Sequence, residues 1–183
     1  MDPEGNPGVR IRTGNFGAER RCDMPDAATG TYEIRWAEDK DWIPAMHMIW
    51  KTFLKFEAVD YTEEGIRNFY DFITDEHLYK SFRQGRYQMM VALDGARIIG
   101  AASVRNYNHL SLLFVDEEYH HRGIGRNLMG RMCEYLKKEE GERYMSLKAA
   151  PYAVDFYRKL GFHAVHEEEA FSGIRVTPME KFL

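Results

Sequence analysis

LLFVDEEYHHRGIG, residues 112–125, joins an apolar run typical of a β-strand to a polar turn and then to two glycines, Gly123 and Gly125. An amphipathic helix is expected next, because apolar residues recur at helical spacing from Ile124 to Met132. Glycines that open a helix after a strand let the backbone approach a ligand, and the first N–H groups of a helix have no partner inside it. These donors, with the helix dipole, favour a phosphate group. A plain strand-to-helix turn is the alternative interpretation.

The composition is that of a globular protein. Hydrophobic residues make up 44% and charged residues 30% of the 183 residues, a length that favours one domain with an appendage. The net charge of −4 gives no basic surface for nucleic acid. No stretch approaches the roughly 20 apolar residues that span a bilayer. The cysteines, Cys22 and Cys133, form no C-x-x-C pair, so neither a metal site nor a disulfide framework is expected and a cytoplasmic location is the default.

Residues 1–30 differ from the rest of the chain. They contain five glycines and three prolines with almost no apolar periodicity. We interpret this segment as a flexible leader without a part in the fold, and a docking arm that orders on binding is the alternative. Residues 31–183 are then a single domain.

Periodicity within residues 31–183 predicts a mixed α/β fold. Alternating or apolar runs predict strands over residues 32–36, 87–93, 97–104, 109–115, 144–148, 162–165 and 174–179. Helical spacing predicts helices over 46–56, 63–73, 123–140 and 151–160, with a short helical turn at 77–82. The order β-α-α-β-β-β-α-β-α-β-β describes a mixed sheet, antiparallel over residues 87–115 and covered by helices.

This order, together with YHHRGIG at residues 119–125 and APYAVDFYRKLGF at 150–162, resembles the GNAT superfamily of acyl-coenzyme A-dependent N-acetyltransferases. The pyrophosphate loop of that family reads Q/R-x-x-G-x-G/A, and a later helix ends in a tyrosine before a Gly-Phe pair. The chain departs from the pattern twice. His120 stands where the family has Gln or Arg, and residues 149–151 lack the Asn that often contacts pantetheine. A dinucleotide fingerprint fits less well because its third glycine is missing.

The resemblance implies a GNAT-type fold, a mostly antiparallel mixed sheet that splays at the cofactor site. It implies acetyl-CoA as co-substrate, with pantetheine against the strand before the loop, pyrophosphate on the loop amides and no metal. The residues assigned to acetyl-CoA are Leu113, Phe114, Val115, His120, His121, Arg122, Gly123, Ile124, Gly125 and Arg126. Leu113 and Val115 as plain core residues, and the arginines as solvated surface charges, are the alternatives.

The resemblance also directs attention to catalytic side chains. Tyr157 is expected to protonate the departing thiolate, since a phenol is a donor at neutral pH. Packing in the last helix is its alternative role. The general base is open between His109, which titrates near neutral pH, and Glu57, in the loop expected to border the acceptor. Asp116 or Glu117, which follow the binding strand, and ordered water are further alternatives. A structural or solvated role is the alternative for each.

The segment over residues 53–69 and a hairpin over residues 166–174 are expected to surround the acceptor. The expected aromatic walls are Phe56, Tyr61, Phe69 and Tyr70, and the expected negative charges are Glu57, Asp60, Glu63 and Glu64. Core packing of the aromatics and surface exposure of the acids are the alternative. An amine with an apolar body suits such surroundings. The implied function is acetyl transfer to a primary amine of a small molecule by direct attack in a ternary complex. A non-catalytic acyl-CoA-binding module and an acetyltransferase for protein lysines or N-termini are the alternatives. Neither nucleic acid nor a membrane is an expected partner, and a homodimer is allowed.

Overall fold

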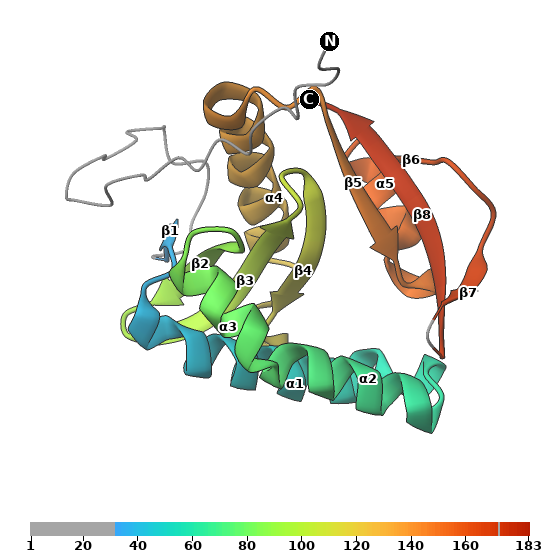
Figure 1. Ribbon diagram of the computed structural model, residues 1–183, viewed down its shortest axis with the longest axis horizontal. Coiled ribbons are helices and arrows are strands. Elements are labelled where there is room, and N and C mark those ends of the chain that lie inside the picture. The colour runs from blue at the N-terminus through green and yellow to red at the C-terminus, as the bar shows by residue number, and fades with distance from the viewer. Residues whose placement is uncertain (1–31, 172) are drawn as a thin grey trace, which may run out of the picture.

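The protein is described by a computed structural model that covers residues 32–171 and 173–183. The predicted leader, residues 1–30, lies outside the described residues. The strands form one sheet in the order β1-β2-β3-β4-β5-β8-β6, and β7 pairs with β8 (Figure 1). The strands are β1 (Glu33–Trp36), β2 (Gln88–Asp94), β3 (Arg97–Arg105), β4 (His109–Val115), β5 (Tyr144–Ala149), β6 (His163–Ala164), β7 (Glu169–Phe171) and β8 (Ile174–Phe182).

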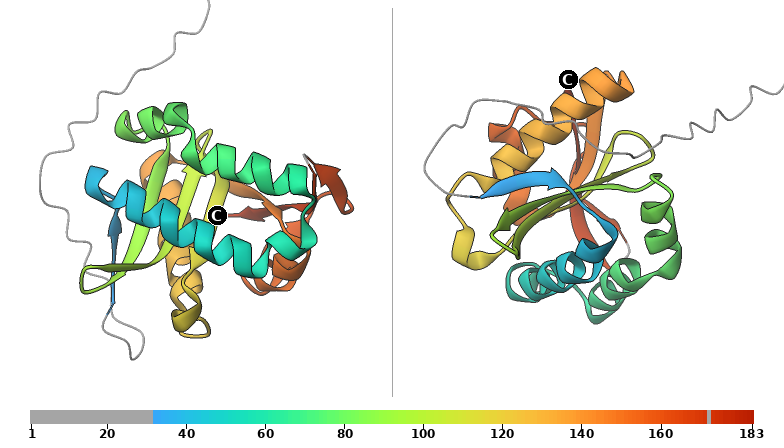
Figure 2. Two further views of the ribbon diagram at one scale, coloured as in Figure 1. Left: turned by 90° about the horizontal axis from the view of Figure 1, so that it is seen from below. Right: turned by 90° about the vertical axis from the view of Figure 1, so that its left-hand side faces the viewer.

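Helices cover both faces of the sheet. They are α1 (Trp42–Phe56), α2 (Glu63–Thr74), α3 (Glu76–Arg83), α4 (Ile124–Tyr135), which continues as the π-turn Leu136–Glu140, and α5 (Val154–Lys159). The first three lie on one face and α4 on the other (Figure 2). In the described part of the chain, no helix is long and apolar enough to cross a membrane.

The sheet divides between β4 and β5. These two strands are parallel and pair only at His109 with Ser146 among the described residues, whereas the other neighbours are antiparallel. Beyond that pair they diverge, and β5, β8 and β6 form a separate arm (Figure 1). The predicted mixed, mostly antiparallel and splayed sheet is therefore confirmed.

A bulge in β4 lies two residues after the pairing of His109 with β5. Ser103 of β3 pairs with Leu112 and Val104 with Leu110, so Ser111 is an extra residue. Its hydroxyl and that of Ser103 are hydrogen-bonded to the buried phenol of Tyr87. As a consequence Leu110 and Leu112 face opposite cores although both occupy even positions. A bulge of this kind bends its strand and increases the local twist.

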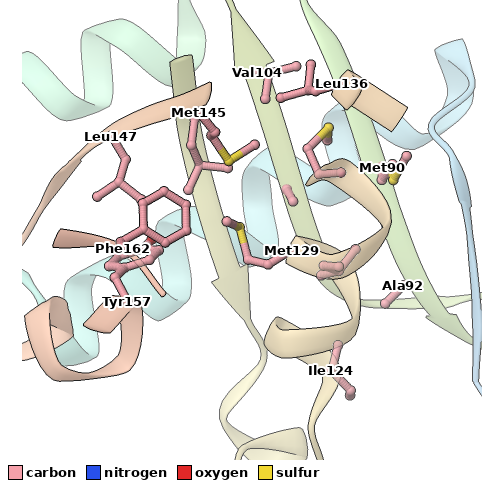
Figure 3. Packing of buried hydrophobic residues seen from close by; sticks show 14 of the residues in the cluster. Met90, Ala92, Val104, Ile124, Met129, Leu136, Met145, Leu147, Tyr157 and Phe162 are labelled. Atoms are coloured by element: carbon pink, nitrogen blue, oxygen red, sulfur yellow. The ribbon is translucent and has the colours of Figure 1, made fainter. Parts of the chain in front are cut away.

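Two apolar clusters, one on each face, hold the molecule together. One joins α1–α3 to the face that carries Leu112 and Phe114. The other joins α4 to both arms, with Met129 among side chains such as Met145, Leu147 and Phe162 from the second arm (Figure 3). Side-chain packing on α4 therefore holds the second arm where the β4–β5 ladder has ended.

Most predicted elements are confirmed, with differences at their ends. The first helix begins at Trp42 rather than at residue 46, and the helical turn predicted at 77–82 is the full helix α3, whose N-cap Asp75 accepts a hydrogen bond from the His77 N–H. Strand β7 was not predicted, because residues 166–169 are polar and its pattern is only three residues long. It makes the expected hairpin with β8.

Candidate active site

The loop between β4 and α4 presents a row of backbone donors. His121 and Gly123 have positive φ angles of 61° and 78°, and Gly123 is the N-cap of α4. The first bond of the helix runs from the Asn127 N–H to the Gly123 carbonyl, so the N–H groups of residues 123–126 have no acceptor within the helix. Successive amides in this geometry at a helix N-terminus form an anion site. The loop thus fits a pyrophosphate.

Gly125 faces the space between the two arms of the sheet. A Cβ atom on Gly125 would lie 3.6 Å from Cγ2 of Val115 and 3.5 Å from Cζ of Phe156. The residue therefore sits where the end of β4 approaches α5. Two exposed arginines flank the loop: Arg126 on the first turn of α4, and Arg122, whose guanidinium lies 4.9 Å from the ring centre of Tyr119. Both add positive charge to the anion site.

His120 has a contact inside the loop. Its Nε2 atom lies 2.8 Å from the carbonyl oxygen of Val115, and because a carbonyl only accepts, Nε2 carries the proton. The ring also lies against Phe56, with 5.0 Å between ring centres. His120 thus ties the loop to the end of β4 and of α1. Its own N–H donates to the Glu117 carbonyl at 3.1 Å, so the amides that face a phosphate are those of the residues after it.

In the part of β4 that diverges from β5, alternate residues have backbone groups that do not pair with β3. The Asp116 N–H donates to the Ile99 carbonyl of β3, and in an antiparallel ladder every second residue points at the partner. The N–H and C=O groups of Leu113 and Val115 therefore point away from β3, toward β5. Those of Phe114 point at β3, and its ring packs near Phe69, with 5.9 Å between ring centres. Of the three strand residues assigned to acetyl-CoA, only the outer two offer backbone groups to a ligand: Leu113 offers its N–H and C=O, and Val115 offers its N–H, because its carbonyl already accepts from His120.

Glu57 lies at the C-terminal end of α1, buried and held by two phenols. Tyr152 donates to its Oε1 atom at 2.7 Å and Tyr61 to its Oε2 atom at 3.2 Å. The residue is only 8% exposed. Tyr61 follows the turn after α1, whereas Tyr152 belongs to the 3₁₀ turn between β5 and α5. The carboxylate therefore bridges the two arms of the sheet.

The environment of Glu57 makes it a stronger base than an exposed carboxylate. Burial raises its pKa, and the hydrogen bonds from Tyr152 and Tyr61 partly oppose that rise. Its place at the negative end of the α1 dipole disfavours the charged form further. Burial and the charge of Glu57 in turn raise the pKa of both phenols. The tyrosines thus remain protonated donors while Glu57 titrates.

Tyr157 lies near this carboxylate. It is the buried residue of α5, and its ring packs edge-on against Phe156 and Phe162, with centres 5.2 and 5.7 Å away. Burial raises the pKa of its phenol, and the charge of Glu57 adds to the effect. The structure therefore brings two of the three predicted catalytic residues, Glu57 and Tyr157, into one cluster.

His109 lies at the other end of β4. Its Nδ1 atom is 3.0 Å from the Ser146 hydroxyl, where the two strands pair. Six residues separate it from Val115, about 20 Å along the strand. The end of α1 lies by the loop after β4, as the contact of Phe56 with His120 shows, so Glu57 and His109 belong to opposite ends of the strand. Burial, with the charges of Arg105 and Lys148, lowers the pKa of His109 to about 4.

Tyr152 is the residue of the cluster that the sequence did not single out. It follows Pro151, which begins a helical turn, and such a position gives no sign of a partner 95 residues earlier. Tyr61 was expected only as an aromatic wall. Of the other expected walls, Phe69 stacks in the core at 4.0 Å from Phe53, and Tyr70 is exposed. Within the described residues, no group of three His, Cys, Asp or Glu side chains is placed to hold a metal ion.

Comparison with known proteins identifies the family. A sequence profile described as an acetyltransferase (GNAT) domain matches residues 57–183. The chain belongs to the GNAT acetyltransferases. It is accordingly an acyltransferase of the N-acetyltransferase class. The matched region begins at Glu57 and includes both glycines of the loop and Tyr157.

Solved structures share the GNAT fold at low sequence identity. A GCN5-related N-acetyltransferase from Rhodopseudomonas palustris superposes with a TM-score of 0.72 at 22% identity, covering 87% of this chain and all of that one. The PaiA N-acetyltransferase from Thermoplasma acidophilum, solved with coenzyme A, gives 0.70 at 21% identity, with 84% and 100% covered. A spermidine N-acetyltransferase SpeG chimera from Vibrio cholerae and hSSAT gives a TM-score of 0.62 at 19% identity, with 84% of this chain and 96% of that one covered. A comparison with curated proteins gave no match.

Proposed function

We propose that this GNAT protein transfers the acetyl group of acetyl-CoA to a primary amine of a small molecule, by direct attack within a ternary complex. The observation that carries the proposal is the buried Glu57 carboxylate, held by Tyr61 and Tyr152 and close to Tyr157. Glu57 and Tyr157 thus lie near one another at the end of the strand that would hold the thioester, which supports their assignment as base and acid.

Glu57 serves as the general base. A primary amine is mostly an ammonium ion at neutral pH and must lose a proton before its nitrogen can attack the thioester carbon. Glu57 takes that proton, which its raised pKa favours. As the C–N bond forms and the C–S bond breaks, the leaving thiolate takes a proton from the Tyr157 hydroxyl. The tyrosinate regains a proton from the nitrogen, which loses its second proton to become an amide, and the proton on Glu57 is released to solvent. His109 is the less suitable base, because its lowered pKa makes it a weak proton acceptor at the far end of β4.

The backbone supplies binding and polarisation. The Leu113 N–H, which points away from β3, donates to the acyl oxygen as negative charge develops on it. The amides of residues 121–126 hold the pyrophosphate, with Arg122 and Arg126 adding charge-assisted contacts. These roles are proposed from the fit of the loop and of β4, and from the family's use of coenzyme A.

A small amine is the preferred acceptor because the carboxylate is buried behind two tyrosines. An amine on a slender apolar body can pass between aromatic rings, and its cationic end is drawn to Glu57. The spermidine N-acetyltransferase chimera of the same fold acts on such a molecule, according to its name. The proposal includes a cytoplasmic location, which is in keeping with the free thiol of Cys133.

The test is acetyl transfer with purified protein. We expect release of thiol from acetyl-CoA, with an acetylated product by mass spectrometry, for at least one member of a panel of polyamines and arylalkylamines. The Tyr157→Phe variant should then lower kcat about ten-fold or more, because its general acid is lost, without weakening coenzyme binding measured by calorimetry.

Two outcomes would contradict the proposal. Transfer to peptides but to no small amine would establish a protein acetyltransferase instead. Binding of acetyl-CoA without transfer to any amine or peptide would establish a non-catalytic coenzyme-binding module.

A further inference from the structure

The turn between β7 and β8 is joined to the first turn of α2. The Gly173 carbonyl accepts two hydrogen bonds from Thr62, one from its N–H at 3.1 Å and one from its hydroxyl at 3.2 Å. The same hydroxyl accepts from the Gly65 N–H at 3.1 Å as the N-cap of α2. One threonine thus begins the helix and holds the hairpin on it. We call Thr62, Gly65 and Gly173 the hairpin latch.

The latch requires glycine at two positions. A Cβ atom on Gly65 would lie 2.6 Å from the Gly173 carbonyl oxygen, a distance that real Cβ atoms do not show. Gly173 has a φ of 81°, and a Cβ there would lie 2.5 Å from the Thr62 hydroxyl oxygen. Glycine is a poorer helix former than alanine. Helix formation alone therefore does not account for Gly65, whereas close contact with the hairpin does.

The latch is adjacent to the Glu57 cluster. Thr62 is the residue after Tyr61, whose hydroxyl donates to Glu57 and whose ring packs edge-on against Phe53, 5.0 Å between centres. The Tyr61 N–H is bonded to the Ala58 carbonyl. The short turn that carries Tyr61 is thus fixed on one side by the end of α1 and on the other by the hairpin from the second arm.

We propose that the hairpin latch positions the Tyr61 phenol, and through it the Glu57 carboxylate, so that Gly65 and Gly173 are positioning residues on the acceptor side of the reaction. This inference rests on the proposed role of Glu57 as the base. It assigns to the β7–β8 hairpin a task beyond covering the acceptor, because the hairpin holds one of the two donors that orient the carboxylate.

The consequence is a defined change in pH dependence. The groups that face Glu57 are the phenols of Tyr61, Tyr152 and Tyr157, and Asp60 acts on Tyr61. The Tyr61 bond lowers the pKa of Glu57, and burial raises it. Losing that bond while burial remains raises the pKa further. The acidic limb of kcat/KM therefore moves to higher pH when the latch is loosened.

The test is a double-mutant cycle between Gly65→Ala and Tyr61→Phe, with Gly130→Ala as the matched control. Gly130 is an exposed helical glycine of α4 with open space where a Cβ atom would lie, so its replacement changes only helix propensity. We expect Gly65→Ala to lower kcat about ten- to a hundred-fold, the cost of a misplaced catalytic group, with acetyl-CoA binding unchanged. The acidic limb of the kcat/KM profile of Gly65→Ala should move to higher pH, as it should for Tyr61→Phe. The double variant should be no slower than Tyr61→Phe alone.

The proposal is overturned if the effects of the two substitutions on kcat multiply in the double variant. It is also overturned if the acidic limb of Gly65→Ala does not move, or if Gly65→Ala has the same kcat as Gly130→Ala. Should Gly65→Ala fail to fold, as judged by circular dichroism, Thr62→Val replaces it, with Thr62→Ser as the variant that keeps the hydroxyl. Failure of the proposed function is recognised separately. If Glu57→Gln retains full activity, Glu57 is not the base, whereas loss of activity in Glu57→Gln with an active Gly65→Ala refutes only the latch.

Discussion

The two ends of β4 hold titratable side chains in opposite settings. At the end paired with β5, His109 contacts the Ser146 hydroxyl and has its pKa lowered to about 4. At the splayed end, the Glu57 carboxylate has its pKa raised by burial and is held by phenols from both arms. Burial disfavours the charged form in both cases, which makes the histidine a poorer base and the glutamate a better one. The same physical cause thus separates two candidates that the sequence left open.

The largest effect is expected from exchanging the carboxylate. Glu57→Gln keeps the shape and loses the base, so kcat should fall by about 10²–10⁴-fold while calorimetry shows unchanged acetyl-CoA binding. The matched change at the other end, His109→Gln, should alter kcat less than about three-fold, because a group about 20 Å along the strand takes no proton from the amine. The reverse order of the two effects would make His109 the base.

A smaller effect is expected where the two arms meet the loop. Gly125→Leu places a side chain between Val115 and Phe156, where we expect the coenzyme to pass. Acetyl-CoA binding should weaken about ten-fold or more, equivalent to about 1.4 kcal/mol. Gly130→Leu, on the same helix with open space around it, is the control and should leave the dissociation constant unchanged. Equal affinities for the two variants would place the coenzyme elsewhere.

The smallest effect concerns stability rather than rate. The His109 pKa is about 4 in the folded chain against an ordinary 6.5. Between pH 4 and pH 6.5 the unfolded chain therefore binds a proton at His109 that the folded chain does not. The contribution of neutral His109 is fully present above pH 6.5 and is lost as the pH falls toward 4. After allowing for screening by solvent, the loss is about 1–2 kcal/mol. Thermal unfolding at about pH 7 and about pH 4.5 should show a smaller difference in Tm for His109→Gln than for the parent, and an equal difference would refute this account.

Local patterns predicted most of the fold. The glycines at 123 and 125, the start at Pro151 and the continuous apolar runs of β2 and β3 are signals that depend on near neighbours in the sequence. The bulge at Ser111 was not predictable, since its position depends on pairing with Ser103 and on the buried phenol of Tyr87. Strict alternation would place Leu110 and Leu112 on one face, and the extra residue places them on two.

The candidate site was predicted less completely than the fold. Tyr157 and the loop amides follow from motifs. The choice of Glu57 over His109 depends on the burial of Glu57 and on its contact with Tyr152, and both arise only when the chain folds. The Phe114 assignment to acetyl-CoA concerns a residue whose backbone groups point at β3, a direction set by the ladder register. Contacts between residues far apart in the sequence decide each of these points.

The extra residue in β4, Ser111, affects how the protein is expected to bind coenzyme A. Ser111 lies two residues beyond the pair that closes the sheet, and a surplus residue at this point turns the rest of the strand away from β5. The divergence of β4 from β5 therefore follows from the extra residue in the sequence and is stabilised by the hydrogen bond between the buried hydroxyls of Tyr87 and Ser103. It does not require an equilibrium between an open and a closed form. We expect the gap between β4 and β5 to be preformed, so that the protein loses little conformational entropy when the pantetheine arm binds there.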